Sequence, residues 1–191
     1  DPAAQIERAG DLGRRQRDPG DALRTQHVLD LQHGDAEELP ADRDGDGTGD
    51  LGGILDHLDH FGTDALPIDA IWLSPIYPSP MRDGGYDVAD YTGVRPQFGT
   101  VADVDRLVEQ AHARALKVLL DAVPCHTSIE HPWFTERPDF YVWSDRDGPQ
   151  NNWRATFGGS SWSRDPHGRG WYLHSFYPEQ PDLDWRNPEV G

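Results

Sequence analysis

Two apolar segments, residues 69–74 and 117–123, constrain the fold more than any other feature of the sequence. Between them, Thr100 and the apolar spacing of residues 101–115 predict an N-capped helix. A strand that is apolar almost throughout and follows a helix predicts a parallel sheet covered on both faces. With a further helix predicted over residues 51–61, the pattern indicates part of an α/β barrel or of an open α/β sheet. Both architectures bind ligands at the C-terminal ends of their strands.

The formal net charge of −17, from 34 acidic and 17 basic residues, narrows the classes of partner. Nucleic acid and anionic membranes are poor partners, because few side chains could neutralise phosphate groups, whereas a neutral ligand or a cation fits better. Cys125 is the only cysteine, so no intrachain disulfide can form. We find no run of about 18 apolar residues and no apolar leader near Asp1, and therefore expect a cytoplasmic protein without a membrane span.

Aromatic residues are unevenly spread along the chain. Residues 1–41 contain none and are rich in Arg, Asp, Gly and Gln, which predicts a poorly ordered segment outside the fold. Residues 42–126 carry the helix and strand patterns. Residues 127–185 are rich in Pro, Gly, Asn, Trp and Ser without a helical period, which predicts an irregular or small-β insertion. We interpret its tryptophans as the core of that insertion rather than as the lining of a sugar cleft.

The acidic loop at residues 42–50 places hard oxygen ligands at alternate positions, a spacing that folds around calcium, with Gly47 at the sharp turn. A complete EF-hand loop would end in Glu at its twelfth position, where this chain has Gly53. We therefore predict a structural calcium loop that resembles only the front of an EF-hand. The alternative is an acidic turn without metal.

Acids and aromatic rings follow both predicted strands. Asp83, Tyr86, Asp87 and Asp90 lie in one loop, which Gly84 and Gly85 allow to turn tightly. A carboxylate can hold two adjacent sugar hydroxyls, and Tyr86 can offer a flat face to the ring. The alternative is a surface loop whose acids satisfy backbone N–H groups.

The second strand delivers Asp121 and His126 to the next loop. His126 could donate to a sugar hydroxyl, or it could be a satisfied structural histidine. A Cys125–His126 nucleophile is disfavoured, because adjacent residues rarely form such a pair and no third group to orient it is evident.

Several motifs then occur in order, namely residues 44–51, 71–75, 85–91, 98–100 and 121–128. Together they resemble the α-amylase family of glycoside hydrolases, family 13. Within that family they are most similar to the α-glucosidases and oligo-1,6-glucosidases. Residues 180–184 also resemble a signature sequence of that subgroup. The order and spacing of the motifs make the resemblance specific.

The resemblance implies an α/β fold, a partial (β/α)8 TIM barrel with a small domain B inserted after the third strand. Residues 42–126 would be the N-terminal part of the barrel, 127–178 domain B, and 179–191 the return toward the fourth strand. The activity implied is retaining hydrolysis of α-glucosidic bonds in small α-glucosides or malto-oligosaccharides. The implied site residues fall into two sets. For the terminal sugar these are Asp83, Tyr86, Asp121 and His126, and for calcium Asp42, Asp44, Asp46, Thr48 (through its carbonyl) and Asp50.

The chain departs from the family pattern in ways that leave other interpretations open. The nucleophile and the acid/base are expected beyond Gly191, so we assign no catalytic residue and expect the 191 residues alone to be inactive. We recognise no first strand before Asp42, and Cys125 and Asp184 stand where the family usually has Asn. A catalytically dead carbohydrate- or calcium-binding remnant, a misread gene fragment, and a related trehalose synthase or sucrose isomerase remain alternatives.

Overall fold

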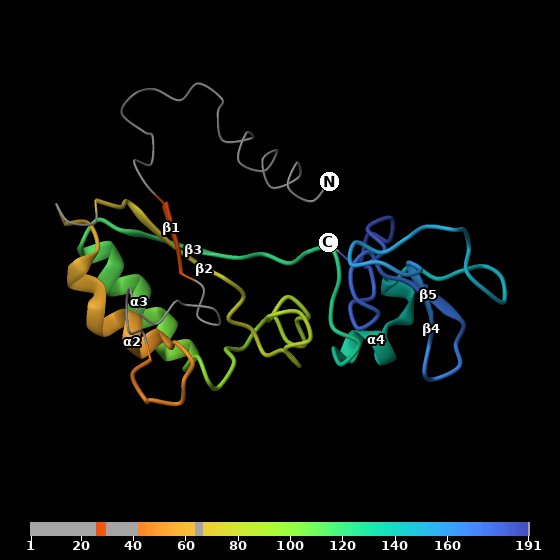
Figure 1. The fold of residues 1–191 in the computed structure, drawn as a ribbon, viewed down its shortest axis with the longest axis horizontal. Coiled ribbons are helices and arrows are strands. Elements are labelled where there is room, and N and C mark those ends of the chain that lie inside the picture. The colour runs from red at the N-terminus through yellow and green to blue at the C-terminus, as the bar shows by residue number, and fades with distance from the viewer. Residues whose placement is uncertain (1–25, 30–41, 64–66, 191) are drawn as a thin grey trace, which may run out of the picture.

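The structure is a computed structural model that describes residues 26–29, 42–63 and 67–190. Three short strands form a parallel sheet: β1 (Gln26–Leu29), β2 (Ala70–Leu73) and β3 (Lys117–Leu120). The strand order is β1-β2-β3, and Ala70 pairs with Gln26 on one side and with Lys117 on the other (Figure 1). The central strand β2 therefore has a hydrogen-bonded neighbour on each side.

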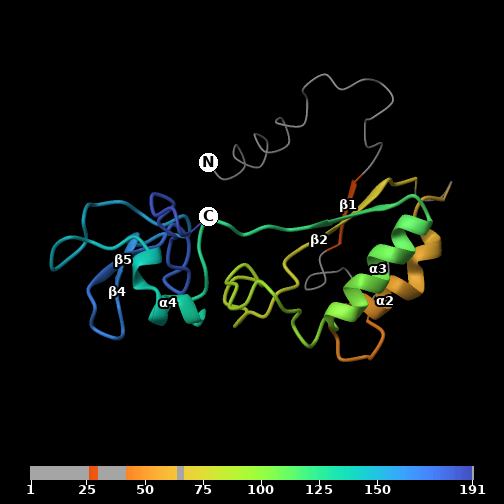
Figure 2. The same cartoon turned by 180° about the vertical axis from the view of Figure 1, so that it is seen from behind.

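Two helices connect these strands and lie side by side in both views (Figures 1 and 2). Helix α2 (Leu51–His57) begins at Asp50, whose carboxylate accepts the Gly53 N–H at 2.7 Å. The prediction of one helix over residues 51–61 is wrong at its end, where the last turn tightens into the 3-10 helix η1 (Leu58–His60). Helix α3 (Val101–Ala113) begins at Thr100, as predicted.

Asp103 completes the N-terminal cap of α3. Thr100 accepts the Asp103 N–H, and the Asp103 carboxylate accepts the Thr100 N–H at 2.8 Å, so two otherwise unpaired donors are satisfied. The two helices and the sheet enclose one apolar core. Its buried members are Leu51, Ile54, Leu58, Phe61, Ile68, Ile71, Leu73, Ile76, Phe98, Leu107, Ala111 and Leu116.

Two predictions about the sheet are wrong. Residues 1–41 were expected to add nothing to the fold, but Gln26–Leu29 form β1; the rest of that segment lies outside the described residues. An edge of β2 needs partners for its N–H and C=O groups, and the backbone of a four-residue segment can supply them. The predicted strand over residues 117–123 ends at Leu120, and both Leu119 and Leu120 are exposed. In the described part of the chain, β3 therefore lacks the cover on both faces that its apolar sequence predicted.

Residues 127–190 contain only short elements, gathered away from the parallel sheet (Figure 2). Helix α4 (Pro132–Glu136) and the 3-10 helix η2 (Pro138–Phe140) precede an antiparallel pair, β4 (Trp162–Arg164) and β5 (Trp171–Leu173). Their buried core residues are Phe134, Phe140, Tyr141, Tyr172 and Leu183.

The tryptophans divide between core and surface. Trp162 is buried, and Trp133 and Trp143 pack against the second core, as the core interpretation predicted. Trp153 and Trp185 are more than half exposed, so the same interpretation is wrong for them. Among the described residues, no helix is long and apolar enough to cross a membrane.

A buried ion pair stabilises the aromatic core of residues 127–190. Asp165, whose side chain is fully buried, accepts two hydrogen bonds from the Arg169 guanidinium, at 2.7 and 3.0 Å. The same guanidinium lies 4.6 Å from the Phe134 ring centroid and 5.1 Å from that of Trp143. Arg169 therefore joins an ion pair to the aromatic core.

We predict that Asp165→Ala lowers the free energy of unfolding by about 3 kcal/mol, because it leaves a partly buried guanidinium unpaired. Urea unfolding, followed by tryptophan fluorescence, measures the loss. Arg186→Ala is the matched control: it removes an ion pair to Asp184 from a side chain that is 81% exposed, and should cost less than about 1 kcal/mol. Equal losses in the two variants would contradict the prediction.

Candidate functional site

The loop that follows β2 is organised around a buried carboxylate. Asp87 is 0% exposed and accepts hydrogen bonds from Ser79 Oγ at 2.7 Å and from the Arg82 N–H at 2.9 Å. Gly84 and Gly85 both have positive φ, 54° and 91°, which confirms the predicted tight turn. The alternative of acids that satisfy the backbone is thus correct for Asp87, but not for the whole loop.

Asp90 also belongs to the turn rather than to the site. Its carboxylate accepts the Thr92 N–H at 2.8 Å and the Thr92 hydroxyl at 2.6 Å. These hydrogen bonds hold the pKa of Asp90 below its usual range, because they stabilise the ionised form.

Three of the four predicted sugar-binding residues come into direct contact. The Tyr86 hydroxyl donates to Asp121 Oδ2 at 2.8 Å, and the Tyr86 carbonyl lies 3.1 Å from His126 Nε2. Tyr86 is 39% exposed whereas His126 is 3% exposed, so the tyrosine offers an open ring beside a buried imidazole. Two loops that follow neighbouring parallel strands therefore build one site.

Gln180 completes this cluster, and the sequence analysis did not single it out as a site residue. Its amide is fully buried and donates to Asp83 Oδ2 at 2.8 Å, while its Nε2 also lies 3.1 Å from His126 Nε2. The Tyr177 N–H donates to Gln180 Oε1 at 3.0 Å, which fixes the orientation of the amide. The one available signal was the resemblance of residues 180–184 to a family signature.

Aromatic rings flank the cluster from the second half of the chain. The Phe176 ring meets the His126 ring edge-on, with centroids 5.2 Å apart. Phe157, which is 54% exposed, stacks on Tyr177 with centroids 4.4 Å apart. Exposed flat rings near carboxylates that can accept hydrogen bonds are groups suited to binding a sugar ring.

Cys125 does not form an activated nucleophile with His126. Its Sγ lies 3.1 Å from His126 Nδ1; although the residue as a whole is exposed, partial desolvation of the sulfur raises the pKa of the thiol, which disfavours the thiolate. Burial also lowers the pKa of His126, because the charged imidazolium loses more solvation than nearby carboxylates return. His126 is therefore a neutral hydrogen-bonding group.

The acidic loop before α2 gathers three of its predicted ligands. One carboxylate oxygen from each of Asp42, Asp44 and Asp50 lies within 4.8 Å of the other two. Asp42 accepts the N–H groups of Gly45 at 2.7 Å and Gly47 at 2.9 Å, and Gly47 has a φ of 88°. The predicted turn is therefore present.

The other two predicted calcium ligands, Asp46 and Thr48, lie outside that trio of side chains. Asp46 Oδ1 accepts the Thr48 N–H at 2.8 Å, so these two residues close the far side of the loop on each other. The trio fits a calcium ion, since oxygen ligands about 2.4 Å from a common ion are at most about 5 Å apart.

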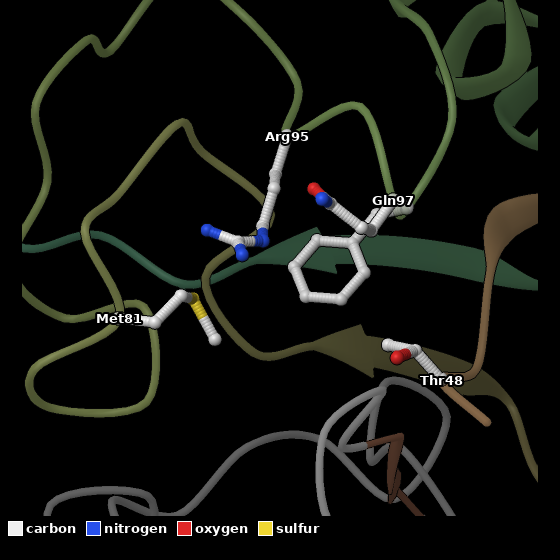
Figure 3. Close-up of a pocket in the computed structure, with 5 residues that line it drawn as sticks. Thr48, Met81, Arg95 and Gln97 are labelled. Carbon is white, nitrogen blue, oxygen red and sulfur yellow. The ribbon is translucent and has the colours of Figure 1, made fainter. Parts of the chain in front are cut away.

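A small pocket lies between the acidic loop and the loop after β2 (Figure 3). It encloses about 180 Å³ and is lined by Thr48, Met81, Arg95, Gln97 and Phe98. The Arg95 guanidinium donates to the Ser79 carbonyl at 2.5 Å. Because none of the four predicted sugar-binding residues lines this pocket, the site built by Tyr86, Asp121 and His126 is separate from it.

Comparison with known proteins identifies the family of the chain. A family model described as the catalytic domain of alpha amylase matches residues 40–191. The chain belongs to the alpha-amylase family. The resemblance stated from the motifs is thereby confirmed, as is the α/β fold class of a partial (β/α)8 barrel.

The chain is similar to several members of this family. It is 48% identical over 158 residues to trehalose-6-phosphate hydrolase of Escherichia coli (strain K12), covering 78% of this chain and 28% of that protein. The oligo-1,6-glucosidase of Heyndrickxia coagulans is 49% identical over 160 residues, with the same shares covered. Thus the chain spans less than a third of the length of the curated relatives it matches.

The chain is also similar to solved structures, and it again covers less than a third of each. The trehalose-6-phosphate hydrolase TreA of Bacillus licheniformis superimposes with a TM-score of 0.77 and 38% identity, covering 87% of this chain and 30% of that one. The isomaltulose synthase of Erwinia rhapontici NX5 superimposes with a TM-score of 0.76 and 40% sequence identity, covering 86% of this chain and 30% of that one.

We predict that the fold loses stability as the pH falls below about 6.5, because burial lowers the pKa values of His126 and His131. Between these lowered values and about 6.5, the unfolded chain binds more protons than the folded chain. The contribution of the two neutral imidazoles is therefore complete above about pH 6.5 and is lost as the pH decreases. Urea midpoints measured at about pH 7.5, 6.5 and 5.5 should fall in that order.

His131→Asn is the matched variant for this measurement. His131 Nδ1 accepts the Trp133 N–H at 3.1 Å at the start of α4, and Asn keeps an acceptor there without titrating. The pH dependence should become shallower but should not vanish, since His126 remains. A midpoint that stays constant or rises on acidification would contradict the prediction.

Proposed function

We propose that the chain is the N-terminal part of an α-glucosidase-type glycoside hydrolase and holds the terminal glucose unit of its substrate. The observation that carries this proposal is the joined cluster of Tyr86, Asp121 and His126, with Asp83 tied to it by Gln180. It combines acceptors, donors and a flat exposed ring in one place, as a site for a polyhydroxylated ring requires.

The hydrogen bonds support recognition rather than nucleophilic attack by Asp83 and Asp121. Each carboxylate already accepts one hydrogen bond, from Gln180 and Tyr86 respectively, and keeps lone pairs for sugar hydroxyls. Retaining hydrolysis needs a further carboxylate nucleophile and an acid/base about 5 Å apart. We propose that this pair lies in the part of the family's length that the 191 residues do not span.

A neutral α-glucoside or malto-oligosaccharide is the proposed ligand. Relatives with similar identity are named for trehalose-6-phosphate hydrolysis, oligo-1,6-glucosidase activity and α-glucosidase activity, so an α-glucosyl unit is what their names share. The net charge of −17 disfavours nucleic acid and anionic membranes as partners. A cytoplasmic location for the protein is part of the same proposal.

We also propose that the acidic loop binds calcium as a structural ion. Asp42, Asp44 and Asp50 would supply carboxylate oxygens, with Asp46 and the Thr48 carbonyl as the further ligands implied by the family resemblance. Asp50 also caps α2, so the ion would reduce the repulsion among acids that hold the start of this helix. The ion would contribute to folding and take no part in the reaction.

We predict that the chain binds methyl α-D-glucoside without hydrolysing p-nitrophenyl α-D-glucoside. Chemical-shift titration of the labelled chain should move the signals of residues 83–86 and 121–126. Asp121→Asn should weaken binding by about tenfold or more, because a charged acceptor of the sugar hydroxyls is lost. Asp184→Asn is the control: that carboxylate is engaged by Arg186 at 2.7 and 2.8 Å, and its loss should leave the affinity unchanged.

Two outcomes would contradict the proposed function. One is the absence of any shift in the site residues at a glucoside concentration of about 100 mM, which corresponds to very weak binding. The other is an equal response to mannitol, which offers hydroxyl groups without a pyranose ring.

For the acidic loop, we predict that about 1 mM calcium raises the thermal midpoint of the chain, and that chelation with EGTA reverses the rise. Asp44→Asn should abolish most of this shift, because it removes one of the three gathered carboxylates. Asp56→Asn, which removes an equal charge from an exposed side chain paired with Arg43, should retain it. A calcium shift that survives Asp44→Asn would instead indicate binding elsewhere.

A further inference from the structure

The turn that carries His126 is held from two directions. On one side, His126 forms a backbone bridge with Asp182, and the Leu183 N–H donates to the Cys125 carbonyl at 3.0 Å. On the other side, the Tyr91 hydroxyl lies 2.8 Å from the Val123 carbonyl and 2.8 Å from the His126 carbonyl. A side chain from the loop after β2 thus reaches the backbone of the loop after β3.

The Tyr91 hydroxyl has one proton for these two carbonyl oxygens. At equal distances the proton is shared between them, which places the oxygen midway and fixes the spacing of the two carbonyls. Val123 and His126 are 5% and 3% exposed, so water is a poor substitute donor. Removal of the hydroxyl would leave two acceptors of the same turn unpaired.

The ring of Tyr91 is itself held in place. Its centroid lies 5.8 Å from that of Tyr77, 5.8 Å from that of His131 and 6.4 Å from that of Trp133. Burial raises the pKa of the hydroxyl, so it remains a donor throughout the physiological range of pH. Because the ring is packed on several sides, the hydroxyl has little freedom to follow a moving backbone.

The position of this turn decides what the His126 ring can reach. On the side facing the site, His126 Nε2 lies 3.1 Å from both the Tyr86 carbonyl and the Gln180 amide nitrogen. In a neutral ring this nitrogen either donates to the Tyr86 carbonyl or accepts from the Gln180 amide, and a displacement of about 0.5 Å away from that partner would take the hydrogen bond beyond good geometry.

We propose that Tyr91 is a positioning residue of the sugar site: its hydroxyl fixes the turn from Val123 to His126, and through it the direction of the His126 ring. This inference rests on the proposed role of His126 in holding a glucose unit. Tyr91 does not touch the sugar, and acts through the backbone alone.

The test compares Tyr91→Phe with a matched variant, Tyr141→Phe. Tyr141 is buried, and its hydroxyl lies 2.7 Å from Oγ of Thr127, the residue after His126, but it contacts a side chain rather than the turn's carbonyls. Each variant loses one hydrogen-bonded hydroxyl. The readouts are the ¹⁵N signals of the His126 ring, assigned by their loss in His126→Gln, and the affinity for methyl α-D-glucoside.

Tyr91→Phe should shift both ring-nitrogen signals of His126 and weaken glucoside binding by about tenfold. Tyr141→Phe should lower the urea midpoint by a similar amount while it leaves the ring signals and the affinity within about twofold of the parent chain. Placing 4-aminophenylalanine at position 91, which restores an N–H donor for each carbonyl, should return the His126 signals toward their original positions.

The proposal is overturned if Tyr91→Phe lowers stability but leaves the His126 ring signals in place, or if Tyr141→Phe moves them equally. Failure of the proposed function is a separate outcome: the parent chain would then bind no glucoside. The comparison of ring signals would still decide the role of Tyr91, because it does not require a ligand.

Discussion

The parallel pairing of β2 with β3 is the constraint on which the rest of the structure depends. Its register sets Leu73 opposite Leu120, so both strands end at the same edge of the sheet and their loops leave side by side. Tyr86 and Asp121 are 35 residues apart in sequence, yet this arrangement brings them within 2.8 Å. The register is stable because β2 buries Ile71 and Leu73 completely against α2 and α3, and a slip by one residue would turn both outward.

Polar contacts then convert two adjacent loops into a rigid site. Asp87 holds the loop after β2 together by accepting hydrogen bonds from the side chain of Ser79 and the backbone of Arg82. The Tyr91 hydroxyl joins this loop to the turn that ends at His126. Gln180 lies 97 residues after Asp83 in the sequence and donates a hydrogen bond to it, which adds the segment near residue 180 to the cluster. Among the described residues, no buried side-chain nitrogen or oxygen lacks a hydrogen-bond partner, as a preorganised site requires.

Local sequence patterns predicted those parts of this arrangement that depend on local physics. The cap at Thr100, the apolar core of β2 and the glycine turn at Gly84 follow from neighbouring residues alone. Strand β1 was missed because its place is set by the unpaired edge of β2 rather than by its own composition. Gln180 was missed for a similar reason, since no local pattern can identify a partner that far along the chain.

The electrostatic balance at His126 bears on the ligand that we propose for the cluster. Burial lowers the pKa of the imidazole and outweighs the opposing effects of the Tyr86 carbonyl and of the nearby carboxylates Asp182, Asp83 and Asp87, which favours the neutral ring. A neutral ring can donate from one nitrogen and accept at the other, whereas an imidazolium would attract anions. Phe176 and Gln180, from the second half of the chain, both contact the His126 ring. For the proposed function, a neutral His126 suits uncharged sugar hydroxyl groups better than anionic groups.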